Sequence, residues 1–107
     1  MMNKLTLGIF LMLINSAVFA TNAEFNGTVK GFYVNSNGEV LVNIRNSASV
    51  PDCNNSSWPF AFNVNDISAK YWLSMLLASK TTEDLIRVGY APSTVGSCSV
   101  NYFYYWD

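Results

Sequence analysis

The stretch ISAKYWLSMLLASK, residues 67–80, is the one segment after residue 20 in which apolar residues recur at helical spacing. Intervals of three and four residues place side chains on one face of a helix, so this stretch predicts a single amphipathic helix. Asn65 or Asp66 is the expected N-cap, because both side chains accept hydrogen bonds from free backbone N–H groups. Residues at helical spacing are Ala69, Trp72, Leu73, Leu76 and Lys80, and Ile67, Met75 and Leu77 widen the apolar face.

The segments on both sides of this helix favour β-structure, because they are rich in β-branched and aromatic residues. Residues 27–35 and 39–45 flank Asn37-Gly38, a dipeptide typical of hairpin turns. In residues 39–45 every second residue is apolar, which predicts a half-buried strand with Val40, Val42 and Ile44 on its inner face. The other expected strands are residues 58–63, with Trp58, Phe60 and Phe62 on one face; residues 83–90, with Ile86, Val88 and Tyr90 aligned; and residues 99–106, with Val100, Tyr102, Tyr104 and Trp106 on the same face as Cys98.

The expected order is thus β-β-β-α-β-β, mainly β with one helix. Five strands with a helix between the third and the fourth is the order of an OB-fold-like five-stranded Greek-key barrel. The alternative is an open five-stranded sheet with one packed helix.

Residues 1–20 have the three parts of a cleavable signal peptide. Lys4 supplies the positive charge, residues 5–14 are apolar, and the segment ends with Val18 and Ala20 at the positions expected before a cleavage site. A membrane anchor is the alternative, but polar Asn15 and Ser16 interrupt the apolar run before it reaches the roughly 20 residues that a spanning helix needs. We expect residues 21–107 to form one secreted or periplasmic domain, with no membrane span after cleavage.

The cysteine content agrees with export. Cys53 and Cys98 are the only two cysteines, and in an exported chain an even number predicts a disulfide. Free thiols or a metal site are the alternatives. The chain has no histidine, so two cysteines alone offer too few soft ligands for zinc. We expect no metal and no cofactor.

Charge and residue types argue against two classes of function. Outside the leader, five basic and seven acidic residues leave a net charge of −2, which gives no electrostatic attraction to nucleic acid. Without histidine the commonest general base is missing, and if both cysteines are oxidised no thiolate nucleophile remains. Glu83 and Asp84 are adjacent carboxylates, but neighbours on a strand point to opposite faces. We therefore expect no enzyme activity, although scattered carboxylates would leave an enzyme possible.

Aromatic residues exceed what the core of one small domain needs, and the last strand has bulky rings on both faces. Exposed rings often form a partner surface or a ligand platform. The alternative is that the helix covers the second face. The candidate ligand-binding residues are Tyr33, Trp58, Tyr105 and Trp106.

A family resemblance rests on the leader, the hairpin, the cysteine loop, the helix AKYWLSMLLASK, the strand DLIRVGY and the closing segment CSVNYFYYWD. With these features the chain resembles small exported bacterial OB-fold proteins. More distantly, the chain is similar to the B subunits of toxins with one A subunit and a B pentamer, especially the subtilase-cytotoxin and pertussis-like group. The resemblance covers most of residues 26–107. It implies a homo-oligomer, a ring of five subunits, that binds host glycans or glycoproteins and carries a toxin A subunit. No sugar-contacting residue of that family is carried over to a position in this sequence.

Two functional hypotheses follow. The first is a secreted, non-catalytic, glycan-binding module of the toxin B-subunit type. The second is a periplasmic or secreted protein-interaction factor, such as an inhibitor, that docks through an exposed strand or aromatic patch.

Overall fold

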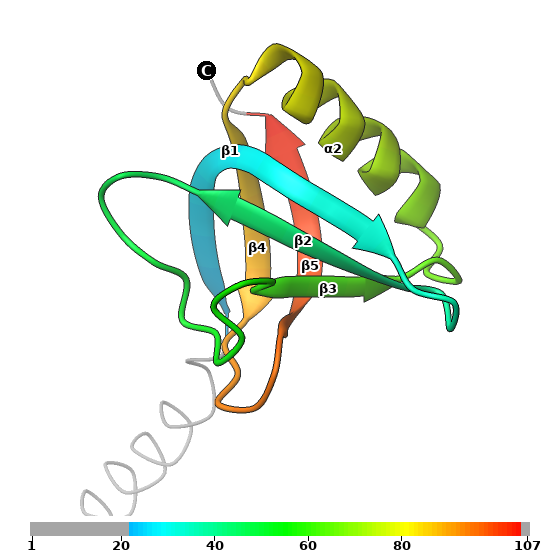
Figure 1. Ribbon diagram of the computed structural model, residues 1–107, viewed down its shortest axis with the longest axis horizontal. Helices are drawn as coiled ribbons and strands as arrows, with labels where there is room; N and C mark the ends of the chain where they lie inside the picture. Colours follow the sequence, from blue (N-terminus) through cyan, green and yellow to red (C-terminus); the bar gives the residue numbers. More distant parts are fainter. Residues whose placement is uncertain (1–21, 106–107) are drawn as a thin grey trace, which may run out of the picture.

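A computed structural model describes residues 22–105 as a five-stranded sheet with one helix (Figure 1). The predicted leader and Trp106 lie outside the described residues. The mainly β composition with one helix between the third and fourth strands is confirmed. The elements are β1 (Ala23–Val34), β2 (Glu39–Arg45), β3 (Phe60–Asn63), α2 (Ala69–Thr82), β4 (Ile86–Ala91) and β5 (Cys98–Tyr105).

All five strands belong to one sheet, and the long strand β1 joins its two ends. The second half of β1 pairs antiparallel with β2, whereas its first half pairs antiparallel with β4. β3 pairs antiparallel with β2, β4 pairs antiparallel with β5, and β3 and β5 run parallel. The strand order is therefore β1-β2-β3-β5-β4, closed by the contact between β4 and β1.

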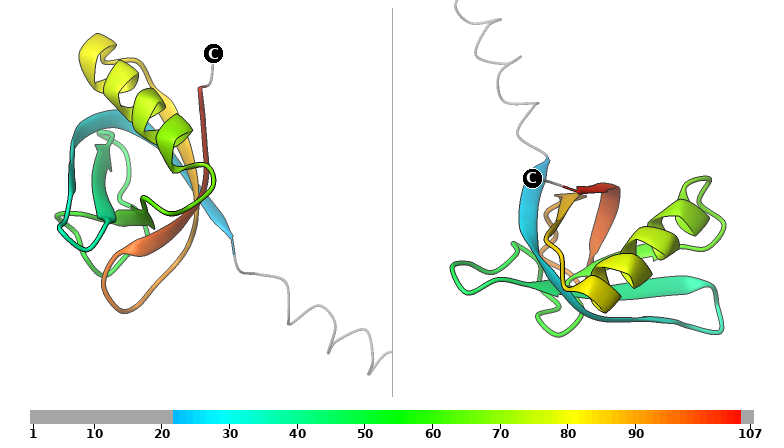
Figure 2. Two further views of the ribbon diagram at one scale, coloured as in Figure 1. Left: turned by 90° about the vertical axis from the view of Figure 1, so that its right-hand side faces the viewer. Right: turned by 90° about the horizontal axis from the view of Figure 1, so that it is seen from above.

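The inner face of the sheet carries the core, and α2 packs against β1 and β5 (Figure 2). The predicted inner residues of β2 and β4 are confirmed, because both sets are buried in one continuous cluster. The register around the turn at residues 35–38 pairs Val34 with Val40, as expected for the hairpin. The core residues on the strands include Phe25, Val29, Val40, Val42, Ile44, Phe60, Phe62, Ile86, Val88 and Tyr90.

The helix begins two residues later than its sequence predicts. Ser68 is the N-cap residue and makes no side-chain capping bond, so the prediction of Asn65 or Asp66 is wrong. Ile67 consequently stays in the preceding turn and is 94% exposed. Leu77 and Lys80 also face solvent, because the buried stripe is narrower than predicted. It consists of Ala69, Trp72, Leu76 and Ser79, with Leu73 and Met75 half-buried beside it.

Halfway along strand β5 the alternate side chains change from one face of the sheet to the other, which the sequence pattern does not predict. Tyr90 pairs with Val100 and the preceding Gly89 pairs with Tyr102, so Asn101 is an extra residue in β5. Such a bulge shifts the two-residue alternation by one position. Val100 and Phe103 are therefore buried, whereas Tyr102 is exposed. The prediction that Tyr102 and Tyr104 share a face with Cys98 is wrong.

Three other predicted boundaries differ. β1 begins at Ala23 and not at residue 27, because its first residues pair with β4. β3 begins at Phe60, so Trp58 lies in the preceding loop, consistent with a proline at position 59 that lacks a backbone donor. Glu83 is the C-cap of α2 and its N–H donates to the Ser79 carbonyl, so β4 begins only at Ile86.

Candidate functional site

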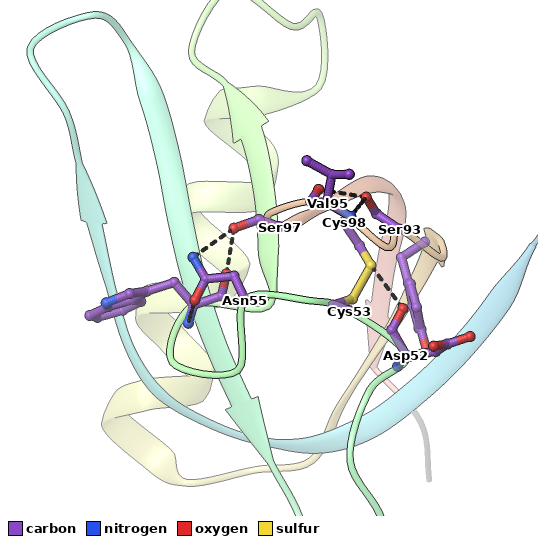
Figure 3. Close-up of a disulfide and its surroundings, with 9 residues drawn as sticks. Asp52, Cys53, Asn55, Ser93, Val95, Ser97 and Cys98 are labelled. Carbon is purple, nitrogen blue, oxygen red and sulfur yellow. Dashed lines mark hydrogen bonds between the residues drawn. A yellow bond between two sulfur atoms is a disulfide. The ribbon is translucent and has the colours of Figure 1, made fainter.

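The disulfide predicted between Cys53 and Cys98 is confirmed, with an S–S distance of 2.02 Å (Figure 3). It joins the loop before β3 to the first residue of β5. Two backbone hydrogen bonds run alongside it, from Asn54 N–H to the Ser93 carbonyl at 3.1 Å and from Asn55 N–H to the Gly96 carbonyl at 2.9 Å. The loop before β3 is therefore fixed along the β4–β5 loop by covalent and hydrogen bonds together.

Asn55 uses this anchored position to hold the backbone of Trp58. Its Oδ1 accepts the N–H of Ser57 at 3.2 Å and the N–H of Trp58 at 3.0 Å. Its Nδ2 donates to Ser97 Oγ at 3.3 Å, and Ser97 Oγ in turn donates to the Trp58 carbonyl at 2.5 Å. Figure 3 shows Asn55 and Ser97 facing one another beside the disulfide. Both polar groups of the Trp58 backbone are thus bonded, and the residue is fixed although it lies outside a strand.

The Trp58 ring lies over Gly31 on β1. A β-carbon built on Gly31 would be 3.7 Å from Cη2 and 3.9 Å from Cζ3 of Trp58, so the ring is in ordinary contact distance of the strand backbone. Tyr33 follows on the same strand and meets Trp58 edge to face, with ring centroids 4.7 Å apart and planes at 80°. Tyr33 is 40% exposed and Trp58 is half-buried. The structure therefore brings two of the four candidate residues together.

An apolar residue that the sequence analysis did not select lies on the same side of the sheet. Leu41 pairs with Tyr33 in one direction and with Ala61 in the other. It points away from the faces of Val40 and Val42, is outside the core cluster, and is nevertheless only 7% exposed. Leu41 therefore lies on the outer face of the sheet, beside Tyr33. We call Tyr33, Leu41 and Trp58 the outer aromatic patch; an apolar residue on the otherwise polar face of β2 was the available sequence signal.

Tyr105, the third candidate, does not join the outer aromatic patch. Tyr105 pairs with Ile86 at the far end of the β4–β5 ladder, and its hydroxyl donates to the Met75 carbonyl of α2 at 2.7 Å. Burial, and then the charge of Asp84, raise the pKa of Tyr105. Tyr105 thus connects the helix to β5. Trp106 lies outside the described residues.

A second group of rings, which the sequence analysis placed on the same face as Cys98, lies on the outer surface of β1, β4 and β5. The hydroxyl of Tyr102 donates to the Glu24 carboxylate, and the Tyr104 hydroxyl lies 3.5 Å from the same oxygen. Arg87 pairs with Glu24 at 3.4 Å, and its guanidinium lies 5.6 Å from the centroid of the Tyr104 ring. The hydrogen bond to Glu24, followed by burial, raises the pKa of Tyr102 to about 12. These side chains bond to one another within the fold, so we regard this Glu24 cluster as structural.

The outer aromatic patch consists of two aromatic rings, with their polar hydroxyl and N–H groups, beside a largely buried leucine. Both cysteines are oxidised. Within residues 22–105, no three His, Cys, Asp or Glu side chains gather as metal ligands, and no helix has the length and hydropathy to span a bilayer. The chain matches no protein-family model, no curated protein and no solved structure.

Proposed function

We propose that this chain is an exported, non-catalytic binding module that binds glycans through the outer aromatic patch. The observation that carries the proposal is the edge-to-face pair of the exposed Tyr33 and the half-buried Trp58, which lies on a loop that the disulfide anchors. A sugar presents apolar C–H faces beside its hydroxyl groups. Tyr and Trp combine a flat apolar ring with a polar tip, so they suit both parts of such a ligand.

The geometry of the pair supports recognition of a ring-shaped ligand. Planes at 80° form a corner, in which a sugar ring stacked on one aromatic ring has its edge against the other. Because hydrogen bonds to Asn55 and Ser97 already fix the Trp58 backbone, binding does not have to order this residue. A preorganised site loses less conformational entropy when the ligand binds.

We also propose an OB-fold-like Greek-key barrel for the domain. The β-β-β-α-β-β order, the closed pairing order of the strands and the position of α2 between β3 and β4 support this assignment. The disulfide and the signal-peptide pattern of residues 1–20 support export, to the periplasm or the medium. Mass spectrometry of the exported protein should find Thr21 as its first residue.

A homo-oligomer would make this site effective. One shallow sugar site binds weakly, but identical sites in a ring raise the overall affinity through effective concentration. The resemblance to toxin B subunits suggests a pentamer that carries an A subunit and binds host glycoproteins. Size-exclusion chromatography with light scattering should give the mass of five domains, whereas a stable monomer would argue against this assembly.

A glycan array probed with residues 21–107 tests the proposed function. We expect binding to a restricted set of glycans, with the signal lost in the Trp58→Ala variant. A protein that is silent on a broad array and monomeric at micromolar concentration would overturn the proposal.

One observation favours the second candidate function, a protein-interaction factor. Beside the narrow buried stripe of the helix, Tyr71 and Leu77 are 63% and 60% exposed, and Ile67 just before the helix is 94% exposed. Exposed apolar residues of this kind are frequent at protein interfaces. This alternative would be selected by two results together. The parent protein would bind no glycan, and a Tyr71→Ala, Leu77→Ser variant would lose binding to a partner protein that the parent captures.

A further inference from the structure

A pocket of about 340 Å³ lies between β2 and the loop of residues 46–59. Its deep wall is apolar, because Phe25, Ile44 and Pro59 line it and all three are buried. Its exposed rim includes Arg45 and Val50. This volume falls in the range of small-molecule sites, which combine an apolar lining with a few placed polar groups. The pocket uses none of the residues of the outer aromatic patch.

The charge of the pocket favours an anion. Arg45 is the only charged residue among the described residues that line it. Arg45 Nε donates to Asn43 Oδ1 at 3.1 Å, which orients the guanidinium. Within residues 22–105 no carboxylate lies within ion-pair distance of Arg45. Its two terminal nitrogens therefore have no charged partner among the described residues, and a guanidinium can bind a carboxylate through two parallel hydrogen bonds.

The rim is held in place by Asn46, so the pocket is built before a ligand arrives. Asn46 Nδ2 donates to the Asn26 carbonyl at 2.5 Å, and its Oδ1 accepts the N–H groups of Ala48 and Ser49 at 2.9 and 2.8 Å. The opposite side of the loop is tied to β5 through Cys53, which also lines the pocket. Both ends of the loop are therefore anchored to the sheet.

Size and lining together define the ligand class. A volume of 340 Å³ equals that of roughly eleven water molecules in the liquid, which corresponds to a ligand of about ten heavy atoms. We propose that this pocket binds a monocarboxylate with an apolar body of about seven to nine carbons. The apolar body lies against Phe25, Ile44 and Pro59, and the carboxylate accepts hydrogen bonds from Arg45. This site is independent of sugar binding at the outer aromatic patch.

Calorimetric titration of residues 21–107 with octanoate tests the proposal. We expect octanoate to bind at least about tenfold more tightly than octanol, because only the acid forms charge-assisted hydrogen bonds. Each methylene removed from the acid should weaken binding about fourfold. Equal affinity for octanoate and octanol, or no binding of either, would overturn the proposal. Binding only to peptides through their terminal carboxylate would also overturn it.

Matched variants locate the site. Arg45→Gln should lower octanoate affinity at least about tenfold, whereas Lys80→Gln, which removes an exposed charge on the helix, should leave it unchanged. Ser56→Phe should abolish binding, because Ser56 lines the pocket and a phenyl ring would fill it. Arg45 is exposed, so its variant should keep the unfolding midpoint of the parent. An Arg45→Gln protein with unchanged affinity would contradict the assignment, and sugar binding at the patch should persist in every variant.

Discussion

The ring of Tyr102 lies directly on the backbone of Gly89, its partner in the β4–β5 ladder. A β-carbon built on Gly89 would fall within the volume of that ring. The tyrosine occupies this place because the bulge at Asn101 turns it outward, where its hydroxyl reaches Glu24 on the far side of β4. The glycine at position 89 therefore permits the bridge from β5 to β1.

Gly89→Ala should destabilise the domain by about 1–3 kcal/mol, as overpacking of a filled site does. The methyl group would displace the Tyr102 ring and break its hydrogen bond to Glu24. Chemical denaturation of the single variants and of the Gly89→Ala, Tyr102→Ala double variant measures the coupling. The unfolding free energy of the double variant should fall by less than the sum of the two single decreases. Additive decreases would show that the two residues are independent.

Tyr102 should ionise well above the ordinary range of a tyrosine. Its pKa is raised from 10.0 to about 12 by the hydrogen bond to the Glu24 carboxylate. Because the folded state favours the neutral phenol, this contribution to stability is complete below pH 10 and is lost as the pH rises toward 12. An ultraviolet absorbance titration should show a late tyrosine transition, which moves to lower pH in Glu24→Gln. An unchanged titration in that variant would contradict the assignment.

Trp72→Ala should destabilise the fold far more than Tyr71→Ala. Trp72 is 9% exposed and meets the rings of Phe62 and Phe103 with centroids 5.0 and 5.6 Å away. Its removal should reduce the unfolding free energy by about 3–5 kcal/mol. Tyr71 is 63% exposed, so its loss should stay within about 0.5 kcal/mol. Equal losses in denaturant titrations would mean that the buried face of α2 is wrongly assigned.

Replacing Cys53 and Cys98 together by Ser should reduce stability by about 4 kcal/mol, because the disulfide closes a loop with a sequence separation of 45. The same change should loosen Trp58, whose backbone depends on Asn55 in the anchored loop. Tryptophan fluorescence reports the loosening of Trp58, and chemical denaturation reports the loss of stability. The Ser99→Ala variant is the control for both measurements. A thiol assay on the unfolded, unreduced parent should find no free thiol, and two reactive thiols would disprove the bond.

Local patterns predicted those parts of the fold that depend on neighbours in the chain. Strand β2 follows its alternation over the predicted residues 39–45, because one face is buried throughout. The reversal in β5 was not predictable in this way, since the bulge at Asn101 depends on pairing with β4. The sequence therefore placed Tyr102 on the wrong face and concealed its bond to Glu24.

The candidate site was predictable only in part, for the same reason. Exposed rings were expected at Tyr33 and Trp58, but their contact arises because Gly31 lets the Trp58 ring lie over β1. The sequence does not indicate that Asn55 and Ser97 hold Trp58. Ser97 lies in the β4–β5 loop, and only the sheet pairing and the disulfide bring this loop beside Asn55. Tyr105 looked equally suitable, yet its hydroxyl bonds to the helix.

The glycan affinity of matched ring variants tests the central claim most directly. The best ligand from an array would be titrated by calorimetry into the parent domain and into Trp58→Ala, Tyr33→Ala and Tyr71→Ala, after equal unfolding midpoints had shown that each variant folds. Tyr71 is the control, because it is an exposed ring on the helix outside the patch. We predict that Trp58→Ala and Tyr33→Ala each weaken binding at least about tenfold, as central aromatic contacts do, while Tyr71→Ala retains the parent affinity. Unchanged binding in the Trp58 and Tyr33 variants, or a loss confined to Tyr71→Ala, would contradict the assignment of the glycan site to the outer aromatic patch.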